Sequence, residues 1–390
     1  MNRAGSTETS AVEAAVHERY TEGARRREAA LCCPVDYDPR YLEAIPSEVI
    51  ERDYGCGDPS RFAREGDTVL DLGSGSGKIC FIASQVVGPA GRVIGLDMND
   101  EMLRLARGAA PEVARRVGHA NVEFRRGLIQ DLRLDVDRLD AWLADHPVRS
   151  ALDLAAMEEA AARIRREHPL VGDDSVDLIV TNCVLNLVRE GAKRDVIREC
   201  FRVLRRGGRL AISDIVSDEP VPDDLKADPA LWSGCVSGAM QESELLTAIE
   251  EAGFHGVAID TWVAEPFRVV NGIEFRSVTV TARKGKQGPC FEENQAVIYK
   301  GPFRQVEDDD HHVMRRGERT AVCAKTYGIL NSEPYAEHFV PVPPREETPQ
   351  TGRRPFDCSR TAPRHPRETK GMDYAATTGP GECCPPGECC

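Results

Sequence analysis

The chain has 390 residues, an apolar fraction of 41%, a charged fraction of 29% and a formal net charge of −14 at pH 7. This length predicts two domains and a tail, and the composition is typical of a globular protein. The negative charge and the lack of a Lys/Arg stripe argue against nucleic acid as a partner, because a phosphate backbone would be repelled. Residues 1–16 are polar and the apolar runs are short, so we expect neither a signal peptide nor a membrane anchor.

The elements predicted in chain order begin with a helix over residues 1–30, whose apolar spacing is poor, and a Pro-rich, lid-like loop region up to residue 66. From residue 67 short apolar strands alternate with helices, which predicts βαβ units in an α/β fold. We therefore expect a mostly parallel sheet with helices on both faces. The expected strands are 68–71, 92–97, 121–124, 175–180 and 209–213, and the expected helices are 78–87, 100–107 and 195–204, the last one ended by Gly207 and Gly208.

The remaining segments complete the predicted domain organisation. A stretch at about 133–172, rich in Ala, Arg, Asp and Glu, predicts one or two solvated helices inserted in the sheet domain. The segments expected are 1–66 (helix and lid), 67–218 (sheet domain), 219–285 (a region that completes the catalytic unit), 286–331 (a β-rich appendage in a small α+β C-terminal region) and 332–390 (a disordered tail).

Fourteen cysteines are many for a chain of this composition. Without an export signal we expect a cytoplasmic protein with reduced thiols, so that metal, metalloid or redox chemistry is a better interpretation than a disulfide framework. Adjacent pairs stand at 32–33, 383–384 and 389–390, and neighbouring cysteines seldom bridge to each other because the bridge strains the peptide between them. The CxxC…CxxC pattern of a zinc ribbon does not occur in the sequence.

The sharpest local motif is a glycine-rich turn between the first strand and its helix. Gly73, Gly75 and Gly77 allow a tight turn and a close approach of a ligand to the backbone. Asp97 ends the next strand, where an acid accepts hydrogen bonds from ribose hydroxyls. Asp71 begins the turn, and its carboxylate would repel a pyrophosphate but would tolerate a cationic aminoacyl sulfonium. This difference favours S-adenosylmethionine over NAD.

The turn resembles the first motif of the class I, Rossmann-like methyltransferases. In that family an acid flanks the adenine after the third strand, and Gly127–Asp131 matches this position, with Ile129 against the ring. The resemblance implies that the sheet domain binds S-adenosylmethionine. The contacts expected for this cofactor are Asp71, Gly73, Gly75, Gly77, Asp97, Met98, Gly127, Leu128, Ile129 and Asn182.

Three cysteines lie in segments where ligands are usually bound. Cys183 directly follows the fourth strand, and ligands of open parallel sheets bind at the carboxyl ends of the strands. Cys56 lies between two glycines in the loop before the sheet, and Cys235 lies among small residues after the fifth strand. A single cysteine of this kind is usually a packed small hydrophobe, as we expect for Cys80 and Cys200.

Three thiolates together favour a soft substrate. A trivalent arsenic held by three thiolates is pyramidal and keeps a lone pair, which can attack a sulfonium methyl group. Holding the two reactants in the correct geometry then supplies most of the catalysis.

At this level of detail the chain resembles the arsenite methyltransferase family over residues 50–285. The matching stretches are Tyr54–Gly57, Asp71–Gly77, Gly95–Met98, Asn182–Val188, Arg202–Gly208, Ser213–Asp214 and Leu231–Cys235. The resemblance implies methyl transfer from S-adenosylmethionine to As(III), with Cys56, Cys183 and Cys235 as ligands of As(III). A fourth cysteine of the family forms a disulfide during turnover and maps onto Cys32 or Cys33.

The resemblance further implies thiol conjugates of arsenite or methylarsenite as the incoming substrate and thioredoxin or glutathione as the reductant, and we expect a monomer. Members of this family often end in a cysteine-rich tail. The terminal pairs of this chain either capture arsenite or form a tail without a catalytic role.

Several features stay open. Asp308–His312 is either a metal site or a solvated acidic turn, and we expect the turn. Cys290 and Cys323 pair, ligate zinc or pack, and we expect packing. Two other functions also remain. Methylation of a small organic acceptor, such as a quinone, predicts dispensable cysteines and a base near the methyl group. A non-catalytic As(III) sensor or scavenger predicts tight binding without turnover.

Overall fold

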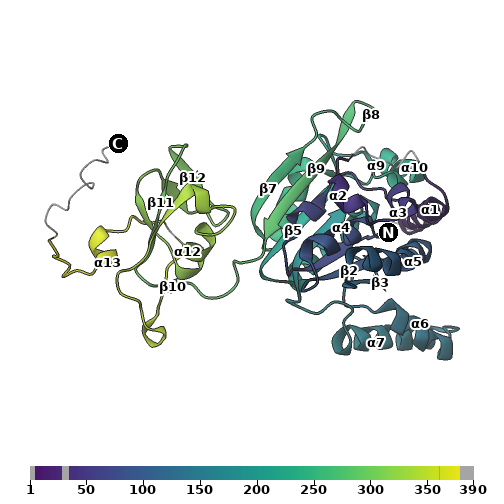
Figure 1. Cartoon of the computed structure of the whole chain (residues 1–390), viewed down its shortest axis with the longest axis horizontal. Coiled ribbons are helices and arrows are strands. Elements are labelled where there is room, and N and C mark those ends of the chain that lie inside the picture. Colours follow the sequence, from purple (N-terminus) through teal and green to yellow (C-terminus); the bar gives the residue numbers. More distant parts are fainter. Residues whose placement is uncertain (1–4, 29–34, 360, 378–390) are drawn as a thin grey trace. The chain divides into compact units, whose positions relative to one another are not determined.

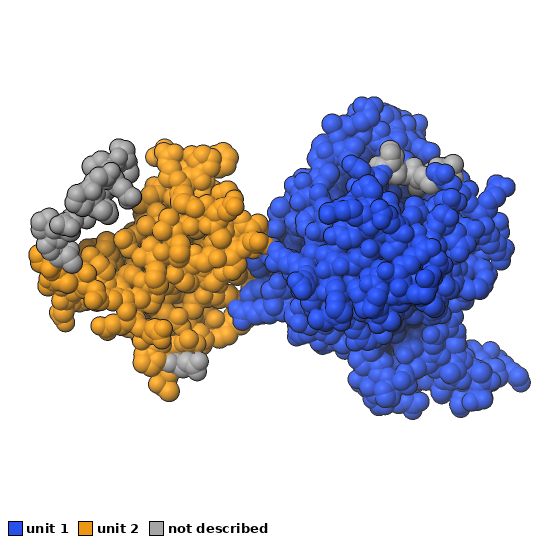
Figure 2. Space-filling model, in the orientation of Figure 1, with its two compact units in different colours: residues 1–285 blue, residues 286–390 orange. Residues whose placement is uncertain are grey.

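The computed structural model describes residues 5–28, 35–359 and 361–377. The chain forms two compact units, residues 1–285 (unit 1) and residues 286–390 (unit 2), shown in Figures 1 and 2. Within the described ranges, no helix combines the length and the apolar character needed to cross a membrane.

Unit 1 is built on a nine-stranded sheet with the order β3-β2-β1-β4-β5-β9-β7, in which β6 pairs with β5 and β8 pairs with β9. Strands β1 to β5 are parallel, whereas β7, β8 and β9 pair antiparallel at one side. The strands are β1 (Thr68–Leu72), β2 (Arg92–Asp97), β3 (Val122–Arg126), β4 (Val176–Asn182), β5 (Leu204–Ser217), β6 (Met240–Gln241), β7 (His255–Trp262), β8 (Arg268–Val270) and β9 (Ile273–Arg283).

Helices cover both faces of this sheet, as predicted for a βαβ chain (Figure 1). The α-helices are α1 (Gly5–Arg25), α2 (Pro39–Leu42), α3 (Ser47–Glu51), α4 (Lys78–Val87), α5 (Asp100–Val117), α6 (Val136–Asp145), α7 (Ala151–Glu167), α8 (Glu190–Val203), α9 (Asp223–Lys226), α10 (Pro229–Ser233) and α11 (Glu242–Glu251). Two 3₁₀ helices, η2 (Pro59–Phe62) and η3 (Leu185–Leu187), complete the unit.

The core of unit 1 follows from the alternation of side chains along its strands. Val69 of β1 packs with α4 and α5 on one face, whereas Leu70 packs with α8 and α11 on the other. Both residues are fully buried, because helices cover the two faces of a parallel sheet. This burial leaves the carboxyl ends of the strands as the accessible edge for a ligand.

The inserted segment forms the helix pair α6 and α7, which carries a small apolar cluster of its own around Leu134, Ala161 and Ile164. Arg165 of α7 donates to the carboxylate of Asp131 at 2.8 Å, which ties the pair to the loop after β3. The insertion is therefore attached to the sheet domain by its own packing and by this ion pair.

Unit 2 is a small α+β fold with three short sheets, of orders β14-β11-β15, β10-β16 and β12-β13. Its elements are β10 (Phe291–Glu292), β11 (Ala296–Tyr299), β12 (Gln305–Glu307), β13 (Val313–Arg315), β14 (Arg319–Ala321), α12 (Ala324–Leu330), η4 (Ala336–His338), β15 (Phe339–Val342), η5 (Gln350–Gly352), β16 (Arg354–Pro355) and α13 (Pro366–Lys370).

The expectation of a disordered tail from residue 332 is wrong for most of the part that the structure describes. Strand β15 pairs with β11 and buries Phe339, and β16 pairs with β10. Arg364, in a segment that reads as charged and Pro-rich, is 6% exposed and is paired with Glu292 at 2.8 Å. Composition misled here because this arginine is neutralised inside the fold rather than solvated.

Candidate functional site

A cavity of about 380 Å³ opens at the carboxyl ends of β1, β2 and β4. Its lining includes Val16, His17 and Tyr20 of α1, Asp53, Tyr54 and Gly55 of the lid, and the strand-end residues Asp71, Gly73, Ser74, Gly75, Asp97, Met98, Asn99, Gly127, Leu128, Ile129, Asn182, Cys183 and Val184. Nine of the ten residues predicted to contact the cofactor are thus brought together at one place, and Gly77 is the exception.

The glycine turn shows why Gly77 differs from its neighbours. All three glycines have positive φ, and a Cβ added at Gly75 meets nothing within 4 Å, so the backbone there is open to a ligand. A Cβ at Gly77 would instead lie 2.8 Å from the ring of Phe124. Gly77 is therefore required for the turn into α4 and for packing, not for contact with a ligand in the cavity.

Asp97 is held in place by backbone groups. Its carboxylate accepts hydrogen bonds from the N–H of Gly75 and the N–H of Asn99, each at 2.8 Å. Burial raises the pKa of Asp97, and these hydrogen bonds oppose that shift. The result is an acceptor fixed at the cavity wall, as recognition of a ribose requires.

Asp131 was expected beside the adenine, but it is not among the residues that line the cavity. Its carboxylate is engaged by Arg165 of the insertion, so it faces the helix pair α6 and α7. The neighbouring Leu128 and Ile129 do line the cavity, and they supply the apolar surface predicted for the ring.

Asp71 places an uncompensated acid at the floor of the cavity. It is 2% exposed, and its side chain accepts a hydrogen bond from the thiol of Cys80 at 3.1 Å. Burial raises the pKa of Asp71 to about 7, the thiol lowers it, and the nearby charges of Asp53 and Asp97 raise it further. Asp53 is paired with Lys78 at 2.5 Å, so Asp71 and Asp97 are the acids that face a ligand in the cavity. Two such acids fit a cationic ligand, and a sulfonium cofactor is one.

This raised pKa gives a prediction about pH. We expect S-adenosylmethionine to bind about tenfold more tightly at pH 8 than at pH 6, because Asp71 loses its proton across this range and only the ionised carboxylate attracts a cation. The measurement is the Kd from calorimetric titration across this pH range. Asp71→Asn, which cannot ionise, should bind more weakly and flatten the profile. Equal slopes for the two proteins would contradict the role given to Asp71.

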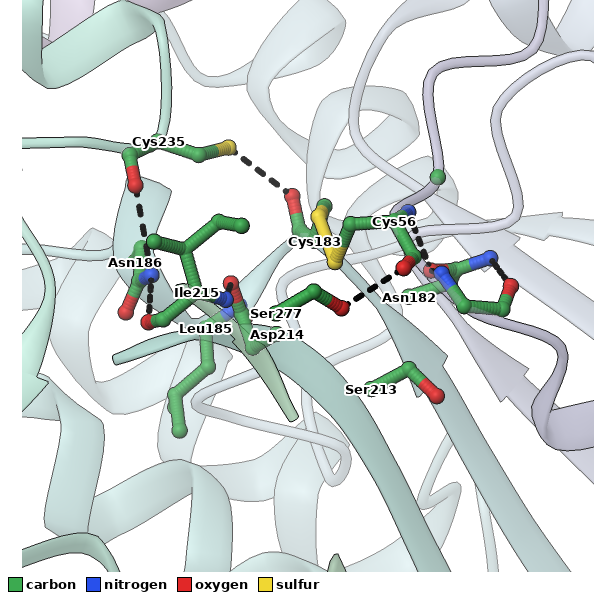
Figure 3. The surroundings of a disulfide bond; sticks show 12 residues. Cys56, Asn182, Cys183, Leu185, Asn186, Ser213, Asp214, Ile215, Cys235 and Ser277 are labelled. Carbon is green, nitrogen blue, oxygen red and sulfur yellow. Dashed lines mark hydrogen bonds between the residues drawn. A yellow bond between two sulfur atoms is a disulfide. The ribbon is translucent and has the colours of Figure 1, made fainter. Parts of the chain in front are cut away.

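The three cysteines predicted as ligands belong to one buried cluster, and each is 5% exposed. Cys56 and Cys183 are joined by a disulfide, with their Cα atoms 5.9 Å apart. The Cys235 thiol donates to the carbonyl oxygen of Cys183 at 3.2 Å, as Figure 3 shows. The sequence analysis expected three separate thiolates, and the structure shows two of them in oxidised form.

The backbone is strained at two of these cysteines. Cys183 has φ +57° and Cys235 has φ +60°, in the left-handed region that residues other than glycine rarely adopt. Such conformations cost about 1–3 kcal/mol each and cluster at functional sites, where the surrounding structure enforces them. The strain therefore marks Cys183 and Cys235 independently of their chemistry.

Asn182 fixes the loop that carries Cys56. Its amide oxygen accepts from the N–H of Cys56 at 2.8 Å and of Gly57 at 3.1 Å, and its amide nitrogen donates to the carbonyl of Gly57 at 2.7 Å (Figure 3). A Cβ at Gly55 would overlap the Asn182 side chain, which explains the glycine beside Cys56. Asn182 thus lines the cavity, as predicted, and also positions a cysteine.

We expect Asn182→Ala to weaken As(III) binding by about tenfold. It removes the three hydrogen bonds between Asn182 and the Cys56 loop, whose net contribution is about 1 kcal/mol each, and only part of that loss reaches the ligand. The measurement is an equilibrium titration of the reduced protein with As(III). Asn182→Asp keeps the oxygen that accepts from Cys56 and Gly57 but loses the donor to the Gly57 carbonyl, so it should lie between wild type and Asn182→Ala. An unchanged affinity in Asn182→Ala would show that the Cys56 loop is held by other contacts.

The structure adds site residues that the sequence analysis did not assign. Asp214 is buried, and one of its carboxylate oxygens lies within 4.8 Å of the sulfurs of Cys56 and Cys183. Burial raises its pKa to about 6, while hydrogen bonds from backbone amides lower it. Asp214 belongs to the Ser213–Asp214 stretch of the sequence resemblance, where no role was assigned to it. Its place beside two thiols indicates a role in proton transfer.

Helix α1 contributes more than its sequence predicted. Tyr20 and His17 line the cavity, and the Tyr20 hydroxyl lies 3.7 Å from the sulfur of Cys235. Burial, and then the charge of Cys235, raises the pKa of Tyr20 well above its usual value. The apolar spacing of α1 is poor, and it gave no sign of this contact because Tyr20 reaches Cys235 through its hydroxyl. Cys32, Cys33 and the four terminal cysteines lie outside the described residues.

Comparisons with known proteins agree with this site. A family model described as a methyltransferase domain matches residues 63–168 and 156–253, and one described as a domain of unknown function matches residues 286–374. An arsenite methyltransferase of Aquipseudomonas alcaligenes is 32% identical over 327 residues, which are 79% of this chain and 83% of that protein. The arsenite methyltransferase of Mus musculus is 30% identical over 371 residues, which are 88% and 86% of the two chains.

Among solved structures, an arsenic(III) S-adenosylmethionine methyltransferase from Chlamydomonas reinhardtii matches with a TM-score of 0.52 and 25% identity, over 83% of this chain and 100% of that one. The prediction of a class I methyltransferase fold that uses S-adenosylmethionine is thereby confirmed. These relatives, together with the cavity and the three cysteines of this chain, show that the chain belongs to the arsenite methyltransferase family.

Proposed function

We propose that this protein is an enzyme that methylates As(III) bound to its cysteines, giving methylarsenite and dimethylarsenite, and that it serves arsenic detoxification. One observation carries the proposal. Cys183 lines the cofactor cavity, its sulfur is bonded to that of Cys56, and its backbone carbonyl accepts a hydrogen bond from the Cys235 thiol, so it joins the two halves of the site. A ligand on these sulfurs is therefore adjacent to whatever fills the cavity.

The residues of the cavity hold the cofactor. S-adenosylmethionine, when bound, supplies an electrophilic methyl group on a positively charged sulfur. The Asp97 carboxylate would accept from its ribose, the open backbone at Gly75 would allow close approach, and Asp71 would offset its positive charge. Leu128 and Ile129 would supply the apolar surface for its adenine. Tyr20, whose hydroxyl lies 3.7 Å from the sulfur of Cys235, forms part of the cavity wall on the side of α1.

The cysteines hold the substrate. Each thiol of Cys56, Cys183 and Cys235 forms a bond to arsenic, and its proton leaves with the hydroxide or thiol that it displaces, so that arsenic stays trivalent. Asp214, within 4.8 Å of two of these sulfurs, relays such protons. The arsenic keeps a lone pair, which would be the nucleophile, and the fixed geometry supplies the catalysis. Transfer of the methyl group raises arsenic to the pentavalent state, and two cysteine thiols that close to a disulfide supply the two electrons that return it to the trivalent product.

The disulfide between Cys56 and Cys183 has to be reduced before the substrate binds. Thiol–disulfide exchange with thioredoxin or glutathione supplies the two electrons, converting the bridge to two thiols and the reductant to its disulfide. Such reductants are kept reduced in the cytoplasm, where we propose that the protein acts. We also propose a monomer, since one chain provides the whole described site. Cys32 or Cys33 is proposed as the family's upstream redox partner.

The test is a turnover assay with purified protein, As(III), S-adenosylmethionine and a thiol reductant, in which arsenic species are separated and quantified. Methylated arsenicals that form only when all three components are present would support the proposal. As(III) binding without methylated product would contradict it in favour of a sensor or scavenger. Methylation of an organic acceptor by a variant that lacks the three cysteines would contradict it in favour of the other methyltransferase function.

A further inference from the structure

Three cysteines of unit 2 come together outside the methyl-transfer site. Cys290 directly precedes β10, Cys323 directly precedes α12, and Cys358 follows β16. Their three sulfur atoms lie within 4.8 Å of one another, and each thiol is free of a disulfide. Cys290 and Cys323 were expected to pack, whereas Cys358 lies in the segment expected to be disordered.

The fold holds two of these cysteines by their backbones. Pairing of β10 with β16 joins the two segments, and the N–H of Phe356 donates to the carbonyl of Cys290 at 2.9 Å. The ring of His312 bonds to the carbonyl oxygen of Cys358 at 2.9 Å, and Asp308 holds the other ring nitrogen at 2.9 Å. The acidic turn that contains Asp308 and His312 thus positions the Cys358 loop. Sulfurs held by separate elements in this way are preorganised as a ligand set.

The third sulfur is held by the start of α12. The N–H of Thr326 donates to the Cys323 sulfur at 3.3 Å, and the Thr326 hydroxyl lies 3.2 Å from the same sulfur. All three sulfurs of the group are therefore positioned by the fold.

Unit 2 has a small core that would gain from such a cross-link. The buried apolar cluster in its described part consists of Val297, Tyr299, Met314, Val322, Leu330 and Phe339. Val322 is adjacent to Cys323, so an ion at the thiols would tie this core to the β10–β16 pair. Small units often obtain part of their stability from a bound metal.

We propose that Cys290, Cys323 and Cys358 bind one thiophilic ion, at a site separate from the methyl-transfer site and independent of the proposed activity. Soft thiolates select soft ions, and As(III) and Zn(II) share this chemistry. As(OH)₃ forms three As–S bonds, and the three thiol protons leave with its hydroxides as water. Zn(II) forms three Zn–S bonds, releases three protons and requires a fourth ligand. The described residues contribute three ligand atoms to this group, the number that As(III) takes.

The experiment measures ions bound per chain. The full-length protein is reduced with a phosphine, incubated with As(III) or Zn(II) alone, dialysed and analysed by mass spectrometry for both elements. The proteins compared are wild type, Cys290→Ser, Cys358→Ser, the double variant, and the control Ser359→Ala, which leaves all three thiols in place. Cys290 and Cys358 are chosen because they are partly exposed, whereas Cys323 is buried.

Each cysteine variant is expected to lose one ion per chain in one of the two arms, and the double variant is expected to lose no more than one. The arm that shows the loss identifies the ion, and Ser359→Ala should match wild type. Unchanged ratios in both arms, or a loss of two ions in the double variant, would overturn the single shared site.

A second measurement applies even if a variant fails to fold. The bound ion should slow alkylation of Cys290, Cys323 and Cys358 in the wild-type protein by about tenfold or more. The extent of alkylation at each cysteine is measured by peptide mapping. Equal alkylation with and without both ions would overturn the proposal.

Discussion

Cys235→Ser is expected to lower kcat/KM for arsenite methylation by at least about 100-fold while leaving the affinity for S-adenosylmethionine unchanged. The serine hydroxyl is a hard donor and does not replace a thiolate on arsenic. Substrate held by two sulfurs alone loses the fixed position on which the reaction depends, and small misplacements cost about 100-fold. The measurement is the rate of methylarsenical formation, together with calorimetric titration of the cofactor.

The control for Cys235→Ser is Cys200→Ala. Cys200 is also buried, at 1% exposure, but it belongs to α8 and packs in the apolar core of unit 1 rather than in the cluster of Cys56, Cys183 and Cys235. We expect this variant to lose about 1 kcal/mol of stability and to retain its turnover. If Cys235→Ser methylates at the wild-type rate, the assignment of three thiolate ligands fails.

Asp97→Ala is expected to raise the Kd for S-adenosylmethionine by about 100-fold. The carboxylate is fixed by the N–H groups of Gly75 and Asn99, so it meets the ribose without reorganisation. Two hydrogen bonds from ribose hydroxyls to a charged acceptor contribute about 1.5 kcal/mol each, and about 1.4 kcal/mol corresponds to tenfold in Kd. The measurement is calorimetric titration of the reduced protein.

Two further variants distinguish the loss of the ribose acceptor at Asp97 from the general loss of a negative charge near the cavity. Asp97→Asn keeps one acceptor oxygen and should fall between wild type and Asp97→Ala. Asp100→Ala removes an exposed carboxylate from the first turn of α5 and should leave the Kd within about twofold of wild type. An Asp97→Ala protein that binds the cofactor normally would show that the glycine turn and the apolar wall suffice.

The bounds of a helix or strand were predicted correctly where a residue with a distinctive backbone or polar role stands at its ends. Helix α4 has the predicted bounds, because Gly77 at its start and Gly88 at its end, both with positive φ, mark the two places where the backbone reverses. The second strand, β2, also has its predicted bounds, Arg92–Asp97, since apolar residues end at a polar ligand-binding position.

Glycines misled the prediction at the end of α8. Gly207 and Gly208 were expected to stop this helix, but it ends at Val203 and the glycines lie within β5. Gly207 has φ +84° and donates to the carbonyl of Lys284, so it serves an irregularity of the strand rather than a helix cap. A glycine pair alone does not distinguish these two uses, because both require the same backbone freedom.

Contacts between distant segments account for the rest of what the sequence did not reveal. The strand-end rule brought nine predicted residues to one cavity, because it depends on topology alone. The contact of Tyr20 with Cys235 and the assembly of Cys358 with Cys290 and Cys323 depend on how whole segments pack. No local pattern records such packing, so neither was predicted.

The left-handed backbone at Cys183 and Cys235 sets stability and fitness against each other. Glycine adopts this conformation without strain, so a screen that rewards only soluble expression should enrich glycine at Cys235, which forms no disulfide. At Cys183 the bond to Cys56 opposes the same exchange. A selection for growth on arsenite should retain cysteine at position 235 and eliminate the glycine clones. Directed evolution of this enzyme towards heat resistance would therefore need a second selection at that codon.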